Sequence, residues 1–215
     1  MSAESPAENH LSRRERRKLE VRNRILEASF GLFEQQGFQA TRVSEICERA
    51  DVAEKTFFNY FPSKRDVLRE IAGAALEQLL LDIETARKRP GSTRDRLLCF
   101  FGQVANRTAE AGPMRRELLT EIIYAGHEAG SGGEQARKLH DSFAAIVRDG
   151  IAAGDLSGSH GAETLTEMLM GAFYVLMFNW ANLDAYPLER QAEAAARFLA
   201  DAMTVQPQRN KRSRS

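Results

Sequence analysis

Residues 54–61 carry the side chains of this chain that are best suited to recognising another molecule. Their sequence, EKTFFNYF, fits a helix of about two turns. On a helical wheel of about 100° per residue, Phe57 and Phe61 fall on one side. Lys55 and Asn59 fall on the opposite side. In the DNA major groove asparagine pairs with adenine and lysine with guanine, so this segment predicts a recognition helix for double-stranded DNA.

The residues around this helix predict the elements that must position it. An apolar face recurs at helical spacing over about 43–50, and residues 51–52 make a tight connection to the recognition helix. Thr41 can act as the N-cap of the helix over 43–50. Thr41, Tyr60 and Lys64 lie near helix ends, where hydroxyl, ammonium and free N–H groups meet phosphates.

The run from about Arg22 to Leu68 resembles the tetracycline-repressor (TetR) family of bacterial transcription regulators. The matching string is ILEASFGLFEQQGFQATRVSEICERADVAEKTFFNYFPSKRDVL. This resemblance implies a helix-turn-helix, a homodimer that represses transcription, and a C-terminal domain whose small-molecule effector releases the DNA. It also implies which residues meet the operator DNA: Thr41, Arg42, Ser44, Lys55, Thr56, Phe58, Asn59, Tyr60 and Lys64.

Three residues depart from the pattern of that family. Asp51 stands where the family usually has glycine, and we expect the turn to survive because aspartate tolerates a left-handed backbone. Ala53 stands where serine or threonine usually caps the recognition helix, which removes a cap worth about 1 kcal/mol. Glu54 places a negative charge near the phosphates, although it also suits the helix dipole.

The rest of the chain shows helical periods only. In the helix expected over 14–36, a set of apolar residues recurs on one face: Leu19, Leu26, Phe30 and Phe33. Ser63 and Ser92 each open a capping box with an aspartate three residues on. We expect an all-α protein of about nine helices. Its expected parts are disordered residues 1–11, a three-helix DNA-binding domain over 12–66, a roughly six-helix ligand-binding and dimerisation domain over 67–205, and a disordered basic tail over 206–215.

Composition and charge favour a cytoplasmic protein, and the family resemblance implies a bacterial one that works at the nucleoid. The 215 residues contain no apolar run of the roughly 18 residues that a membrane span needs, and the first 20 residues do not read as a signal peptide. The two cysteines read as buried thiols. Lys and Arg together equal Asp and Glu at 30 each, but basic residues gather over 13–24 and 209–214. Basic ends suit phosphate contacts, and solvated solubility patches are the equal alternative.

Two further sets of residues are expected in the C-terminal helices. An apolar effector pocket is expected from Phe100, Phe101, Val104, Ile123, Tyr124, His127, Met170, Phe173, Tyr174 and Met177, although each of these residues also suits a plain core. The helix over about 162–183 is apolar nearly all round, so a partner subunit could cover one side of it. A four-helix dimer interface is expected from Leu169, Leu176, Trp180, Ala192, Ala196 and Leu199.

An enzyme and an architectural DNA-binding protein are the alternatives. The sequence has no Gly-rich phosphate loop, no Gly-x-Ser-x-Gly and no Cys-x-x-Cys, so we expect no catalysis, no cofactor and no metal. An architectural protein would bind DNA with weak sequence preference, a steep salt dependence and no release by a ligand. The expected partners are therefore an operator DNA, a second copy of the chain and an unidentified lipophilic small molecule.

Overall fold

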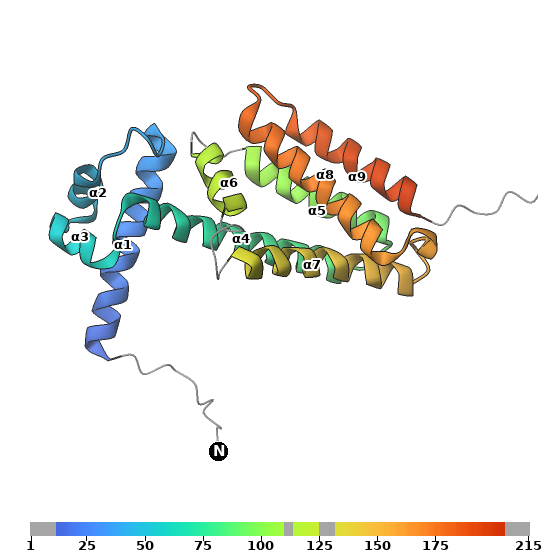
Figure 1. Ribbon diagram of the computed structural model, residues 1–215, viewed down its shortest axis with the longest axis horizontal. Helices are drawn as coiled ribbons and strands as arrows, with labels where there is room; N and C mark the ends of the chain where they lie inside the picture. Colours follow the sequence, from blue (N-terminus) through green and yellow to red (C-terminus); the bar gives the residue numbers. More distant parts are fainter. Residues whose placement is uncertain (1–11, 110–113, 125–131, 205–215) are drawn as a thin grey trace, which may run out of the picture. The chain divides into compact units, whose positions relative to one another are not determined.

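The computed structural model of the protein describes residues 12–109, 114–124 and 132–204. The expectations for residues 1–11 and for the tail after residue 204 lie outside these ranges. The described residues contain no strand, and a single isolated bridge joins Leu156 to Thr204. The all-α prediction is confirmed (Figure 1). The α-helices are α1 (Arg13–Gln36), α2 (Val43–Ala50), α3 (Glu54–Tyr60), α4 (Lys64–Lys88), α5 (Thr93–Ala109), α6 (Arg115–Tyr124), α7 (Gly132–Ala152), α8 (Ala162–Asn182) and α9 (Leu188–Met203).

The chain divides into two compact units, with the boundary between Ile71 and Ala72. That boundary falls inside α4, five residues after the end that the sequence predicts for the DNA-binding domain. None of the described helices combines the length and the apolar character that a membrane crossing requires.

In the first unit, α2 packs against α1 and α3 against α2. The core holds Ile25 and Phe33 from α1, Ile46 from α2, and Phe57 with the following Phe61. Burial of side chains this large stabilises the unit by about 1.5–3 kcal/mol each. The shortness of α2 and α3 is therefore compensated by packing, because helices of seven or eight residues are marginal on their own.

The predicted apolar face of α1 is partly wrong. Leu19 is 45% exposed and Phe30 is 48% exposed, whereas Ala28 and Ser29 are buried beside the predicted Phe33. The core-facing strip of α1 is therefore rotated by about one residue from the predicted strip. It begins only at Ile25, so Leu19 belongs to an earlier part of the helix that this core does not reach.

Both predicted serine–aspartate pairs form at a helix start, and the Ser92 pair is a full capping box because the Ser92 backbone N–H also donates to Asp95 Oδ2 at 3.0 Å. The Asp66 backbone N–H donates to Ser63 Oγ at 3.3 Å, and the Ser63 hydroxyl donates to the Asp66 carboxylate at 2.6 Å. The same pair of residue types, Ser92 and Asp95, opens α5 with distances of 3.2 Å and 2.6 Å. These local contacts fix where α4 and α5 begin.

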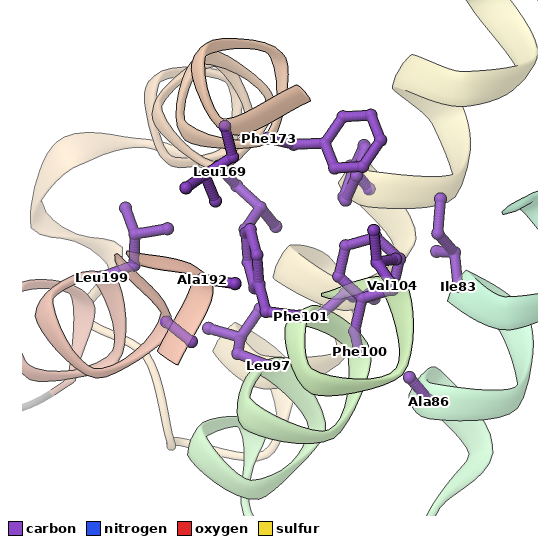
Figure 2. Packing of buried hydrophobic residues seen from close by; sticks show 14 of the residues in the cluster. Ile83, Ala86, Leu97, Phe100, Phe101, Val104, Leu169, Phe173, Ala192 and Leu199 are labelled. Atoms are coloured by element: carbon purple, nitrogen blue, oxygen red, sulfur yellow. The ribbon is translucent and has the colours of Figure 1, made fainter. Parts of the chain in front are cut away.

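The second unit is built around one apolar cluster. Helix α5 packs against α9 and α7, and α8 packs against α7, α9 and α6. In Figure 2 the side chains of Leu97, Phe101, Leu169, Ala192 and Leu199 point toward one another from α5, α8 and α9. Phe100, Phe143 and Phe173 extend the cluster, with ring centroids 5.4 to 5.9 Å apart. Such ring contacts add to the burial energy of the cluster.

Candidate nucleic-acid interface

The recognition helix predicted from the sequence is α3, and its two faces differ as expected. Phe57 is fully buried and Phe61 nearly so, with their ring centroids 6.0 Å apart. Lys55 and Asn59 are exposed on the other side. Phe58 is 50% exposed and meets the Phe57 ring edge-on at 5.3 Å. An exposed aromatic ring held by a buried one provides a fixed apolar surface next to two hydrogen-bonding side chains.

The turn between α2 and α3 has the conformation expected from its unusual residue. Asp51 adopts the left-handed conformation, with φ 51° and ψ 56°. The Val52 backbone N–H donates to the Cys47 carbonyl at 3.0 Å, which closes the end of α2. Ala53 occupies the N-cap of α3 without a side-chain hydrogen bond, as its methyl group requires. The helix-turn-helix geometry therefore survives both departures from the family pattern.

The start of α2 differs from the prediction. Arg42, not Thr41, occupies the N-cap position, and its backbone N–H donates to Glu45 Oε2 at 2.7 Å. Thr41 is buried, and its hydroxyl donates to the Gly37 carbonyl at 2.8 Å. Gln36 Nε2 donates to the Glu45 carboxylate at 3.1 Å and lies 3.3 Å from Thr41 Oγ1. The Thr41 hydroxyl thus stabilises the turn before α2 instead of capping that helix.

Lys64 lies in a more enclosed environment than a surface phosphate contact would suggest. Its Nζ donates to the carbonyl of Phe38 at 2.6 Å and to that of Thr41 at 2.7 Å, and Gln39 O lies at 3.5 Å. The ammonium lies 4.3 Å from the centroid of the Phe38 ring. Burial lowers the pKa of Lys64, and the Glu45 carboxylate partly offsets that effect. No pattern in the sequence points to Gln36, Phe38 and Glu45 as partners in this arrangement.

The predicted DNA-contacting residues therefore fall into three groups. Thr41 is buried, and Lys64 is bonded to backbone carbonyls. Thr56 and Tyr60 are half-buried. The third group is exposed in the first unit: Arg42, Ser44, Lys55, Phe58 and Asn59.

The first two turns of α1 add an exposed basic surface. Ser12 and Glu15 form a capping box: the Glu15 backbone N–H donates to Ser12 Oγ at 3.2 Å, and the Ser12 N–H donates to Glu15 Oε2 at 2.8 Å. All residues from 12 to 20 are exposed. The basic residues of this surface are Arg13, Arg14, Arg16, Arg17 and Lys18.

The residues predicted to line an effector pocket are largely core residues. Phe100, Phe101, Val104, Phe173 and Met177 are buried in the apolar cluster of the second unit, and Met170 and Tyr174 are half-buried at its edge. Burial raises the pKa of the Tyr174 hydroxyl, and the Glu167 carboxylate adds to this shift. The side chains of Ile123 and Tyr124, and all of His127, lie outside the described part of the chain.

A cavity of about 370 Å³ lies elsewhere in the second unit, at the turn between α8 and α9. Trp180 lines one side of it, and the segment Ala185–Arg190 lines the rest. Ala185 has a positive φ of 54°, which alanine seldom adopts. Of the predicted residues of the second unit, only Trp180, assigned to the dimer interface, borders this cavity.

The residues predicted for a dimer interface lie inside the single subunit. All six are buried inside the subunit's own core: Leu169, Leu176, Trp180, Ala192, Ala196 and Leu199. The large apolar side chains that α8 and α9 expose are different ones, namely Met168, Val175, Phe178 and Phe198, the last being 72% exposed. Residues 168, 175 and 178 recur at helical spacing, so they form one stripe along α8.

Comparison with known proteins places these features in context. Residues 25–71 match the family described as "Bacterial regulatory proteins, tetR family". The chain is 32% identical over 200 residues to the HTH-type transcriptional regulator AcrR of Shigella flexneri, covering 87% of this chain and 91% of that protein. It is 33% identical over 141 residues to the HTH-type transcriptional repressor KstR of Mycolicibacterium smegmatis, covering 65% of this chain. The matches to KstR proteins span 61–66% of the length of those relatives.

A solved structure extends the likeness to nearly the whole chain. It is the crystal structure of Thermus thermophilus FadR, a TetR-family transcriptional repressor, in complex with lauroyl-CoA. The TM-score is 0.63 at 25% sequence identity, over 87% of this chain and 97% of that one. The matched region includes both units, so the similarity is not confined to the helix-turn-helix.

Proposed function

The chain belongs to the TetR family of bacterial regulatory proteins, and on that premise we propose that it represses transcription by binding an operator DNA through α3. Members of this family regulate transcription and are not enzymes, which confirms the prediction that the chain does not catalyse a reaction. The proposal further assigns it to the cytoplasm, where the operator is accessible.

The two-faced arrangement of α3 is the observation that carries this proposal. Phe57 anchors the buried side of the helix in the core, and Lys55 and Asn59 therefore project from a helix whose position is fixed. A pre-positioned lysine and asparagine can each read a base edge in the major groove, at about 1–3 kcal/mol of discrimination per good bidentate contact. Arg42 and Ser44, exposed at the start of α2, are suited to phosphates beside that groove.

A homodimer is the second part of the proposal. The exposed apolar stripe of α8 and Phe198 of α9 are costly to leave in water, and a second copy of the same surface would bury them. Two-fold symmetry then implies an inverted-repeat operator. In the simplest geometry, the two recognition helices enter the groove about 34–36 Å apart.

The effector is the third part. We assign it to the class of compounds that carry an apolar acyl chain, with long-chain acyl-CoA as the first candidate. Support comes from the apolar cluster of α5, α7 and α8, and from the lauroyl-CoA bound by the T. thermophilus relative. Because Phe100, Phe143 and Phe173 are packed together without the ligand, an acyl chain would have to separate them. The effector would thus favour a different arrangement of the second unit and shift the equilibrium away from the DNA-binding state.

Selection of bound DNA from a random pool tests the proposal directly. The purified protein is incubated with random duplexes at about physiological salt, where non-specific binding is weak, and the bound fraction is sequenced. An enriched inverted repeat that lauroyl-CoA releases is the expected result. A pool without a shared motif would point to the architectural alternative. An enriched repeat that no acyl-CoA releases would leave the operator function intact and refute the effector class.

A further inference from the structure

The turn in front of α2 leaves backbone carbonyls that the described backbone does not satisfy. Residues 37–42 leave α1 and enter α2, and no backbone N–H among the described residues donates to the carbonyl of Phe38 or of Thr41. Thr41 is buried and Phe38 is half-buried. A buried carbonyl without a donor costs about 1–3 kcal/mol, so this turn needs a donor from elsewhere.

Lys64 supplies that donor from a point 23 to 26 residues later in the chain. It is the first residue of α4, and the hydrogen bonds between Ser63 and Asp66 fix where that helix begins. From this fixed origin, its ammonium reaches the carbonyls of Phe38 and Thr41 at 2.6 and 2.7 Å. These distances are typical of strong hydrogen bonds from a charged donor.

The two short bonds leave the ammonium one N–H for a further partner. A lysine ammonium has three N–H donors, and two of them are used in the two short bonds. The third lies toward Gln39 O at 3.5 Å, and one side of the group is covered by the Phe38 ring. Burial also lowers the pKa of Lys64, which is the direction expected when an ammonium loses hydration water.

We propose that Lys64 controls operator affinity as a positioning residue, which clamps the turn over 37–42 and thereby fixes the start of α2, apart from any contact that its third N–H makes with a phosphate. The inference rests on the proposed function of α3, since it concerns how that helix is held for DNA. It adds a positioning role to the phosphate contact that the family resemblance implies for Lys64.

The clamp would act on DNA through α2. The first residues of α2 include Arg42 at its N-cap and the exposed Ser44, and α2 in turn packs against α3. Without the ammonium, the two carbonyls would turn toward water, and the turn would leave its present conformation. The start of α2 and the exposed side of α3 would then be held less firmly, which weakens binding to every DNA sequence.

Replacement by arginine separates the clamp from a phosphate contact, because the two roles predict opposite results. A phosphate site accepts arginine at least as well as lysine. Carbonyl oxygens that converge on a compact ammonium do not fit the planar guanidinium fork. We therefore expect Lys64→Arg and Lys64→Met both to lose about tenfold or more in operator affinity. In Lys64→Arg, which keeps the positive charge, the slope of log affinity against log salt should stay that of the unmodified protein.

Lys55 provides the matched control, because it is an exposed lysine of the same unit. Lys55→Arg should retain most of the affinity, and Lys55→Met should either reduce the salt slope by about one or relax one base position. Amide hydrogen exchange adds a readout that needs no DNA. Exchange in α2 should be faster in both Lys64 variants and unchanged in both Lys55 variants.

The unmodified protein supplies a measurement that does not depend on a variant folding. In its NMR spectrum without DNA, the Lys64 ammonium protons should exchange with water much more slowly than those of Lys55. The clamp is refuted if Lys64→Arg binds the operator as tightly as the unmodified protein, or if the two ammonium groups exchange equally fast. Failure of the unmodified protein to bind any DNA would instead refute the proposed function, while the exchange measurements would still decide on the clamp.

Discussion

Asp155, three residues after the end of α7, holds the first residue of α5. Its Oδ2 accepts a hydrogen bond from the Thr93 backbone N–H at 2.8 Å and another from the Thr93 hydroxyl at 3.1 Å. Thr93 is fully buried, so this carboxylate satisfies a helix N-terminus that water does not reach. Gly150 packs against this residue so closely that there is no room for a side chain. A Cβ at this position would lie 2.6 Å from Thr93 Oγ1 and 2.8 Å from Leu156.

Gly150→Ala should therefore destabilise the protein, although alanine is the better helix former. The added methyl group must push Thr93 or Leu156 aside, and overpacking of this kind costs about 1–3 kcal/mol. Urea unfolding at neutral pH measures the difference. Gly102→Ala in α5 is the control, since nothing lies within 4 Å of its added Cβ and we expect no loss of stability. Equal losses of stability at the two positions would contradict the close packing of Gly150 against Thr93 and Leu156.

Asn59→Ala should remove sequence information rather than general affinity for DNA. The exposed amide of Asn59 is expected to pair with one base, so its loss should cost about 1–3 kcal/mol on the operator and relax the preference at a single position. Binding isotherms on the selected operator and on its single-base variants give both quantities. Asn23→Ala, at an exposed position of α1, is the comparison and should leave the base preference unchanged.

Neutralising the start of α1 should change the salt dependence of binding. The triple change Arg13→Gln, Arg14→Gln and Arg17→Gln removes three exposed charges from the same two helical turns. If each meets a phosphate, the slope of log affinity against log salt should decrease by about 0.9 per contact. Fluorescence anisotropy at four or five salt concentrations measures it. An unchanged slope would mean that these charges serve solubility.

Phe198→Glu should convert the protein to monomers without unfolding it, because this ring is 72% exposed in the single subunit. A charge placed in an apolar interface costs several kcal/mol, whereas on a monomer surface it costs little. Light scattering gives the mass, and circular dichroism reports folding. Leu81→Glu, at an exposed leucine of α4, controls for a general effect of the new charge. Dimers that persist in Phe198→Glu would place the interface elsewhere.

Stability should fall in acid partly through Glu84. Hydrogen bonds from Arg87 and Lys88 lower the pKa of its carboxyl to about 2. Because the folded-state pKa is depressed, the stabilising contribution is complete above the ordinary pKa near 4.5 and disappears as the pH falls toward 2. The side chain is 41% exposed, so the contribution at neutral pH is only roughly 0.3–0.5 kcal/mol.

Glu84→Gln tests that reasoning. The variant should be slightly less stable than the unmodified protein at pH 7, and the two should become equally stable near pH 2. Urea unfolding at several pH values gives the comparison. Glu77→Gln, at an exposed glutamate of the same helix, should show no such convergence. A difference that stays constant with pH would show that the ion pairs of Glu84 add nothing.

The sequence predicted the helices well because their signals are local. Capping boxes at Ser63 and Ser92, and the apolar spacing of Phe57 and Phe61, depend on residues within one or two turns. The role of Lys64 was not predictable in this way, because its partners lie more than 20 residues earlier.

The faces of α8 show a second limit of sequence patterns. This helix is apolar nearly all round, so spacing alone could not tell the buried Leu169 and Leu176 from the exposed Val175 and Phe178. Only the packing of α5, α7 and α9 decides which stripe turns inward. The residues predicted for the interface are therefore the buried ones of these helices, and the exposed stripe is the surface that we propose for the dimer.

Trp180 gives the protein a built-in optical reporter. It is the only tryptophan in the chain, and its indole borders the cavity at the turn between α8 and α9. Emission excited selectively from tryptophan therefore comes from one known place in the second unit. A change in colour or intensity on adding an acyl compound, or on diluting the protein, would report rearrangement at that turn without any attached dye.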